Sequence, residues 1–423
     1  MSARYDLSYQ LRLLRARALR RSFRVTTPIF DTLRSSFSTS VYDAEAMILK
    51  AQSQTGLRDF FTPPPKEALS ALLSSIRANN TLNAIGRTAL RVDVLRLLSN
   101  HLRLVELCRQ NPNLARQPIF SPVFIMGLPR TASSFLHSML ILDTRHRAPT
   151  IAEVTYPYFA LASPPGSNLR MRRALHWLDV LEPDFQNAYP SHPKSPQECS
   201  EILSNTMESL RFDSTYDVPE YLTWMDQRTH TGAYEFHRRF LQSLDHVSSG
   251  EKRWVLKCPD HVFYYQDLLR VYPDARIIVT HRDPGRVLPS VASLTMILQG
   301  LFSDRVDPAR VAQRVLDRWI LGARRVIEIA DSEHARSQRV LHVVYDELVR
   351  SPLPMLEKIY RFLETPFHET TASKVREHLD RSEVGSYRAN RYSEQFQKLL
   401  PAALVREHFR DYLARFDLRE REK

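Results

Sequence analysis

The chain has little glycine, few cysteines and no long apolar run. Only 10 of its 423 residues are glycine, against a usual share of about 7%, so Gly127 and Gly285, which both lie in turns, stand out. The three cysteines, Cys108, Cys199 and Cys258, lack metal-ligand spacing and cannot all pair with one another. No apolar run is close to the length of a membrane span, which is about 20 residues. No secretory apolar segment follows the N-terminus. These absences predict a cytoplasmic protein without a disulfide scaffold.

Positive charge is in excess. Lysine and arginine number 59 against 47 acidic residues, a formal net charge of +12. Such a balance favours a polyanionic ligand, nucleic acid or an anionic membrane surface. Residues 1–24 carry seven arginines against one acid, with leucines at helical spacing. This segment predicts a basic helix, packed or in solvent, with a transit peptide or peripheral membrane contact as its functional alternatives.

The periodicity of apolar residues divides the chain into three parts. Residues 1–118 are predicted to be a helical N-terminal region, 119–398 an α/β domain, and 399–423 a charged C-terminal helix or tail. In the α/β domain short β-branched runs alternate with helical ones, which predicts a parallel sheet. The expected helices of the first part are 42–54, 66–78 and 83–110, and the expected strands are Val123–Met126, Trp254–Leu256, Arg276–Thr280 and Val340–Val344.

Residues 122–140 have the layout of a phosphate cradle. An apolar strand runs into a hydroxyl-rich turn, in which Arg130, Thr131, Ser133 and Ser134 supply donors, and then into a helix. The turn lacks the Gly-Lys-Ser/Thr ending of a nucleoside triphosphatase loop. It therefore predicts phosphate binding without triphosphatase activity, the alternative being hydroxyls that only cap the helix.

A second segment, 276–294, places an arginine at a strand end and a serine two helical turns later. Arg282 and Ser290, eight residues apart, suit a second phosphate, because a guanidinium and a hydroxyl can hold it from two sides. Asp283 and Pro284 fit an ordinary helix start as well. Together the two segments predict a ligand phosphorylated at two places.

These two segments resemble the 5′-phosphosulfate loop and the 3′-phosphate motif of the sulfotransferase superfamily, in the family's order and about 150 residues apart. Two further segments agree. Trp254–His261 resembles the Lys-x-Pro-x-His strand end of bacterial-type members, with Lys257 lying 25 residues before Arg282, and Val344–Pro352 resembles the family's Tyr-Glu-Asp-Leu segment. The resemblance implies a P-loop-like three-layer sandwich, a central parallel sheet flanked by helices and preceded by the helical N-terminal region.

The resemblance also implies the co-substrate 3′-phosphoadenosine-5′-phosphosulfate (PAPS), used without a metal. The sulfuryl group would be held by Arg130 and Lys257. The resemblance implies these further nucleotide contacts: Thr131, Ala132, Ser133 and Ser134, with Phe135, at the 5′-phosphate, Arg282 and Ser290 at the 3′-phosphate, and Tyr345 along the nucleotide.

The chain departs from the family at Ala132, where glycine is common. If the backbone has a positive φ at Ala132, the alanine is strained and the loop distorted; if it is helical there, the alanine is harmless. Arg130 stands where cytosolic members have lysine, and its fork spans two oxygens.

Three residues compete for the role of general base toward the acceptor. Glu153 lies 23 residues after Arg130, near the place of the catalytic glutamate of tyrosylprotein relatives, His261 follows Lys257 by four, and His192 precedes a Pro-Gln-Glu-Cys segment. The expected acceptor is a small molecule, carbohydrate or lipid with a free hydroxyl or amine, and not a nucleic acid. Two alternatives stay open: a nucleotide-binding protein of this fold that has lost turnover, and a basic membrane- or nucleic-acid-surface protein.

Overall fold

The computed structural model describes residues 15–16, 39–79, 81–157, 180, 182, 192–245, 252–381, 390 and 392–418. Apart from residues 15 and 16, the arginine-rich segment 1–24 lies outside the described residues.

Five parallel strands form one sheet in the order β2-β3-β1-β4-β5. The strands are β1 (Val123–Gly127), β2 (His146–Arg147), β3 (Arg253–Lys257), β4 (Arg276–His281) and β5 (Val340–Val344). The four predicted strands are confirmed, whereas the two-residue β2 was not predicted. From β1 the chain builds one side of the sheet with β2 and β3, and then crosses to build the other with β4 and β5. The carboxyl ends of β1, β3 and β4 therefore meet where the strand order reverses, the usual ligand site of such sheets.

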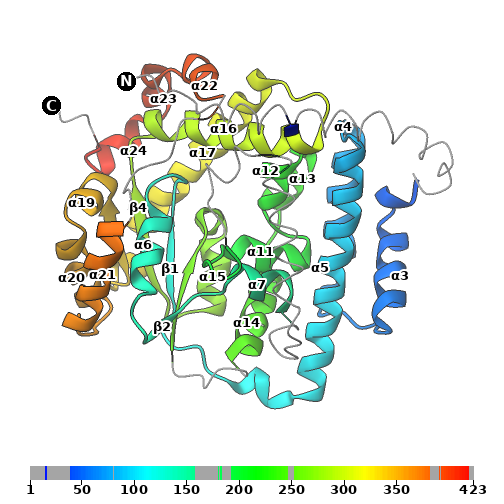
Figure 1. The fold of residues 1–423 in the computed structure, drawn as a ribbon, viewed down its shortest axis with the longest axis horizontal. Helices are drawn as coiled ribbons and strands as arrows, with labels where there is room; N and C mark the ends of the chain where they lie inside the picture. The colour runs from blue at the N-terminus through cyan, green and yellow to red at the C-terminus, as the bar shows by residue number, and fades with distance from the viewer. Residues whose placement is uncertain are drawn as a thin grey trace.

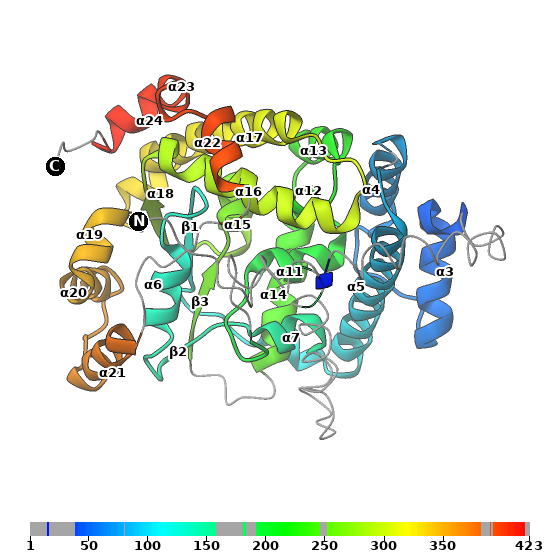
Figure 2. The same cartoon turned by 45° about the horizontal axis from the view of Figure 1, so that its top comes forward.

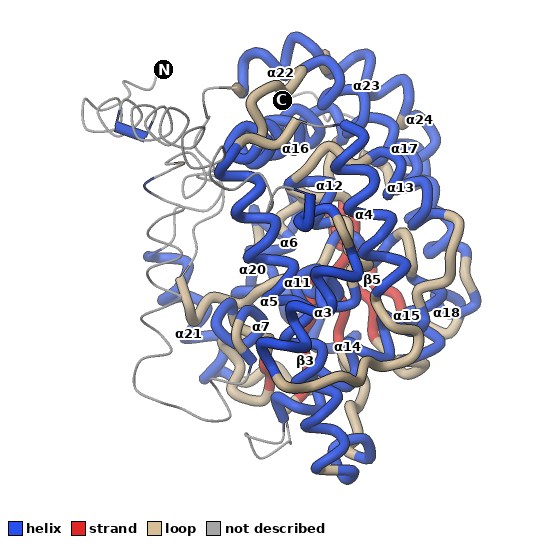
Figure 3. The backbone as a smooth tube through the Cα atoms, turned by 90° about the vertical axis from the view of Figure 1, so that its right-hand side faces the viewer, coloured by secondary structure: helices blue, strands red, loops and turns tan. Residues whose placement is uncertain are grey.

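Alternate side chains of the central strand enter two different cores, because successive residues of a strand face opposite sides. Phe124 and Met126 of β1 belong to one core, and Val123 and Ile125 to the other. The second core is completed by α6 (Ser133–Leu140), α19 (Tyr345–Arg350), α20 (Pro352–Phe362) and α21 (Glu369–Arg381). The first is completed chiefly by α14 (Thr231–Asp245), α15 (Tyr265–Val271), α16 (Pro284–Phe302) and α17 (Pro308–Asp331). The strands thus lie between two helical layers, which confirms the three-layer sandwich (Figure 3).

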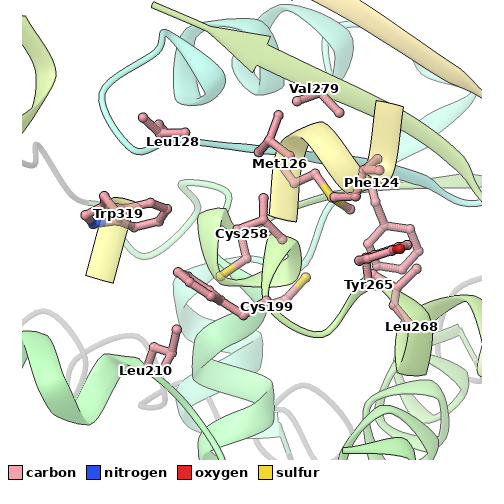
Figure 4. Close-up of a cluster of buried hydrophobic side chains, with 14 of the residues drawn as sticks. Phe124, Met126, Leu128, Cys199, Leu210, Cys258, Tyr265, Leu268, Val279 and Trp319 are labelled. Carbon is pink, nitrogen blue, oxygen red and sulfur yellow. The ribbon is translucent and has the colours of Figure 1, made fainter. Parts of the chain in front are cut away.

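Two free cysteines belong to the first core. Cys199 and Cys258 lie among its buried side chains with Phe124 and Met126 (Figure 4). Burial raises the pKa of both thiols, and the neighbouring carboxylates raise it further. The two thiols therefore stay protonated and pack as small apolar groups.

The helical N-terminal region has α3 (Ala44–Thr55), α4 (Lys66–Asn79) and α5 (Ala84–Gln110), close to the predicted segments. Their core is shared with α12 (Arg211–Thr215) and α13 (Pro219–Asp226). These N-terminal helices lie at the end of the molecule away from α19–α21 (Figure 1). Shorter elements complete the description: η1 (Thr39–Tyr42), η2 (Pro112–Arg116), α7 (Ile151–Thr155), α11 (Cys199–Leu203), η3 (Ser204–Thr206), η4 (Pro259–Val262) and α18 (Glu333–Arg336).

The C-terminal part folds onto the α/β domain as α22 (Ser393–Leu399), α23 (Ala402–His408) and α24 (Arg410–Arg415). Phe396, Val405 and Tyr412 are buried in the same core as β1. Figure 2 shows the three short helices beside α16 and α17. The charged segment predicted for 399–423 is therefore, as far as residue 418, part of the packed domain, and this matters for the site because α23 contacts the start of α16.

The expectation that no apolar run approaches the length of a membrane span was wrong: one helix in the described part of the chain, α16, is long and apolar enough to cross a membrane by length and composition. It is 56% buried inside the structure and packs against α17, α22 and α23. This packing is that of a core helix.

Candidate active site

The loop after β1 is fixed by contacts to β4. Gly127 has a φ of 130°, and a Cβ there would lie 2.4 Å from the carbonyl oxygen of Thr280, so this position requires glycine. The hydroxyl of Thr131 donates to the carbonyl of Leu128 at 2.7 Å and lies 2.6 Å from the hydroxyl of Thr280. The Thr131 side chain thus anchors the loop, and a contact from Thr131 to a 5′-phosphate would come from its backbone.

Helix α6 starts directly after this loop. Ser133 and Ser134 form its first turn, and Phe135 packs in part against the core beneath α6. Backbone N–H groups of a first helical turn have no partner inside the helix and attract an anion. The two serines therefore lie where the sequence places the 5′-phosphate.

Ala132 has a φ of 63° and a ψ of 19°, the left-handed conformation. A positive φ is the case for which strain at Ala132 was predicted. A residue with a Cβ pays about 1–2 kcal/mol in this conformation. Arg130 also has a positive φ, 62°, so the loop holds two strained residues around Thr131.

Replacing Ala132 with glycine is expected to raise the free energy of unfolding by about 1 kcal/mol, because glycine adopts the left-handed conformation without the Cβ clash. Denaturant unfolding measures the change. The matched control is Ala71→Gly inside α4, which should lower the stability by about 1 kcal/mol. A loss of stability in both variants would show that Ala132 is not strained.

The structure joins the two predicted phosphate segments. Nε of Arg130 donates to Oγ of Ser290 at 3.1 Å, and Nη1 of Arg282 donates to the carbonyl of Arg130 at 3.1 Å. Arg282 follows β4, and Ser290 lies in the second turn of α16. Two arginines and a serine separated by about 150 residues thus meet at the switch point of the sheet. Fixed guanidinium groups so placed can hold a doubly phosphorylated nucleotide.

Tyr345 extends the same cluster. It follows β5, and the guanidinium carbon of Arg282 lies 3.8 Å from the centre of its ring. A cation stacked on an aromatic face loses part of its freedom before a ligand arrives. Tyr345 therefore holds Arg282 from the side away from β1.

Helix α23 supports the start of α16. Arg406 donates through Nε and Nη2 to Oδ2 of Asp283, at 3.0 and 2.6 Å, while Oδ1 of Asp283 accepts the N–H of Gly285 at 2.9 Å. A Cβ at Gly285 would lie 3.1 Å from the Cβ of Ala402, so glycine allows α23 its close approach. Arg406, Asp283 and Gly285 position the segment that carries Arg282.

Lys257 is the last residue of β3, and only 3% of it is exposed. Its Nζ forms an ion pair and hydrogen bond with Oε1 of Glu198. Glu198 precedes α11 and its side chain is 25% exposed. A buried ammonium needs such a partner, so the lysine expected at the sulfuryl group is held by a carboxylate that is not among the predicted site residues. Its only earlier signal was its place in the segment Pro196-Gln-Glu-Cys199.

The three predicted candidates for the base lie in different surroundings. Glu153 forms a capping box with Thr150: Oε2 accepts the N–H and the hydroxyl of Thr150, while Oε1 contacts Arg147 at 3.2 Å. The exposed His192 lies in a turn, where its Nδ1 accepts the N–H of Lys194. No contact described for either side chain joins it to Lys257.

His261 is fully buried in the first core. Its Nδ1 lies 2.8 Å from the hydroxyl of Tyr234, and the ring packs edge-on against Phe124. Within the described part of the structure its Nε2 has no hydrogen-bond partner. Burial lowers the pKa of His261 well below its usual value, so the ring is neutral.

Among the described residues, no three His, Cys, Asp or Glu side chains gather as a metal site would require.

A parallel sheet with a phosphate loop after its first strand and arginines at the switch point defines an α/β enzyme that binds a phosphorylated ligand. The chain belongs to the sulfotransferase family, whose model matches residues 122–369. This confirms the predicted resemblance and the class of enzyme.

The chain is also similar to individual proteins that are named as sulfotransferases. The chain is 25% identical to omega-hydroxy-beta-dihydromenaquinone-9 sulfotransferase Stf3 of Mycobacterium bovis over 310 residues, 70% of this chain and 74% of that protein. The structure is similar to sulfotransferase STF9 from Mycobacterium avium, with a TM-score of 0.75, 21% identity, and 90% of this chain and 98% of that one covered. It is also similar to STF1 from Mycobacterium tuberculosis, with a TM-score of 0.71, 24% identity, and 84% and 98% covered. Both solved structures have the fold described above.

Proposed function

We propose that this sulfotransferase moves the sulfuryl group of PAPS to the hydroxyl of a small, lipid-like acceptor. One observation carries the choice of donor: Arg130, Arg282 and Ser290 form a single hydrogen-bonded cluster between the loop after β1 and the start of α16. A ligand with phosphate groups at two ends is the kind of molecule that both halves of this cluster fit. The acceptor class is supported by Stf3, whose name describes a hydroxylated menaquinone.

Each group of residues would bind a different part of PAPS. The first turn of α6 would bind the 5′-phosphate, and Arg282 with Ser290 the 3′-phosphate. Lys257 and Arg130 would hold oxygens of the transferring group and of the leaving phosphate. Sulfuryl transfer resembles phosphoryl transfer, in which a loose transition state places charge on such oxygens, so fixed cations provide most of the catalysis.

The test measures the release of adenosine 3′,5′-bisphosphate (PAP) from PAPS with a hydroxylated polyprenyl quinone, a simple phenol and a sugar as acceptors. We expect turnover with the quinone and none without PAPS. Turnover with the sugar alone would contradict the lipid-like acceptor, and the absence of turnover with all three, despite PAP binding by calorimetry, would contradict sulfuryl transfer.

A second candidate function rests on the strained Ala132. A loop distorted at this residue would leave a nucleotide-binding protein without turnover, the outcome described last. For either function we propose a cytoplasmic location, where thiols such as Cys199 and Cys258, which are free in the structure, stay reduced.

A further inference from the structure

The carboxylate of Glu198 contacts Lys257 at the end of β3 and does not cap its own helix, α11. Glu198 stands at the N-cap position of α11 and makes no side-chain cap hydrogen bond, although residues at this position commonly accept one from the first turn. Its Oε1 contacts Nζ of Lys257, and its Oε2 lies 4.0 Å from Sγ of Cys258. Both partners lie at the carboxyl end of β3, the edge of the sheet where the sulfuryl group is expected.

The backbone of the segment before α11 is fixed. The N–H of Gln197 donates to the carbonyl of Pro149 at 2.8 Å, and the N–H of Glu198 donates to Oε1 of Gln197 at 2.9 Å. Residues 150 and 196 form an isolated β-bridge next to it. The carboxylate is therefore presented by a rigid segment and not by a loose loop, as a group that exchanges protons with a bound substrate must be.

The charged and titratable groups around Glu198 suit a base. Lys257 lies on one side, and the buried thiols of Cys199 and Cys258 on another. The pKa of Asp260 is raised to about 7, first by burial and then by the Glu198 charge, while the charge of Arg318 opposes this rise. The Glu198 side chain is 25% exposed, so a molecule from solvent can reach it.

We propose that Glu198 is the general base that takes the proton of the acceptor hydroxyl, an inference that rests on the proposed function. An ammonium has three N–H donors, so Lys257 can hold Glu198 with one and an oxygen of the sulfuryl group with another. Only the ammonium of Lys257 then lies between the base and the sulfuryl group. The acceptor oxygen forms a bond to sulfur, the bond from sulfur to the 5′-phosphate oxygen breaks, the proton passes to Glu198, and PAP leaves.

Glu198 fits this role better than the earlier candidates. Both carboxylate oxygens of Glu153 are engaged by the helix start and by Arg147. His261 is enclosed in the core. Glu198 alone of these contacts Lys257 directly.

The experiment compares Glu198→Gln with the wild type in PAP release. We expect kcat to fall by about 100- to 10,000-fold, the usual contribution of a general base, while the affinity for PAP measured by calorimetry stays within about threefold, less than one hydrogen bond to a charged group contributes. Glu235→Gln, on the exposed side of α14, is the matched control and should keep the wild-type rate and thermal midpoint.

Two further readouts separate a base from a residue that only holds Lys257. The acidic limb of the kcat/KM–pH profile should disappear in Glu198→Gln but persist in Glu235→Gln. Glu198→Ala should regain activity with added formate, which can take the proton in its place. A wild-type rate in Glu198→Gln, a loss in Glu153→Gln instead, or an acidic limb that persists would overturn the inference. Absence of turnover in the wild type would overturn the proposed function itself.

Discussion

Replacing Lys257 with methionine is expected to lower kcat by about 100- to 1,000-fold, the usual effect of removing one fixed transition-state donor. Methionine fills a similar volume without charge, so β3 should keep its packing. The affinity for PAP should change less than kcat, because PAP keeps the leaving phosphate but lacks the sulfuryl oxygens that Lys257 would also hold in the transition state. Single-turnover PAP release and calorimetry with PAP measure the two quantities. Equal losses in rate and PAP affinity would contradict a role at the sulfuryl group.

A structural explanation of the same loss can be separated from the chemical one. Without Lys257, the Glu198 carboxylate lacks its cation, and a buried unpaired charge costs about 3–5 kcal/mol. The cost here should be smaller, since 25% of the Glu198 side chain is exposed to water. The double variant Lys257→Met/Glu198→Gln removes both charges and should recover most of the lost stability. Turnover should stay low even when stability recovers, because Glu198→Gln alone is expected to lower kcat. If turnover returned with stability, neither Lys257 nor Glu198 would act in the chemistry.

The central fold could be predicted because its signals are local. Four strands are short, largely apolar runs; β1, β3 and β4 are buried on both faces, whereas the edge strand β5 is only partly buried. Helices α3, α4 and α5 carry apolar residues at helical spacing. By contrast β2 consists of His146 and Arg147 alone, too short and too polar for any periodicity. The C-terminal part carries apolar residues at helical spacing, such as Phe409, Tyr412 and Leu413, but this spacing does not show which part of the chain they pack against. Their place in the core follows from distant contacts that no local pattern contains.

The candidate site likewise has parts that local sequence predicts and parts that it does not. The phosphate segments were predictable because each is a strand end followed by a helix start, and parallel strands bring such ends together. The inward turn of Thr131 depends on Thr280, and the support of Asp283 depends on Arg406. Neither partner is a neighbour in sequence.

Candidate bases are harder to predict than phosphate contacts. His261 is four residues from Lys257 in sequence, yet η4 turns its ring into the core. Glu198 is 59 residues away, yet it touches Lys257. Distance along the chain therefore does not show which side chain contacts this lysine.

Replacing Arg282 with alanine is expected to weaken PAP binding by about 10- to 100-fold, because a hydrogen bond to a charged group contributes about 1.5–3 kcal/mol. Tyr345 and the carbonyl of Arg130 already hold this guanidinium in place, so little ordering is required when the ligand binds. Arg282→Lys keeps the charge but loses the planar fork, and it should bind PAP with intermediate affinity.

The matched ligand for this variant is adenosine 5′-monophosphate, which lacks the 3′-phosphate. If Arg282 holds the 3′-phosphate, Arg282→Ala should bind this nucleotide as the wild type does, and the preference of the wild type for PAP should be reduced by the same 10- to 100-fold. Calorimetry with both nucleotides and both proteins gives the four affinities of a thermodynamic cycle, and these give the coupling between Arg282 and the 3′-phosphate. An equal loss for the two nucleotides would show instead that Arg282 acts through the loop, since its Nη1 also holds the carbonyl of Arg130. In that case removing Arg282 would release the two strained residues of the loop, and Ala132→Gly should restore part of the lost affinity.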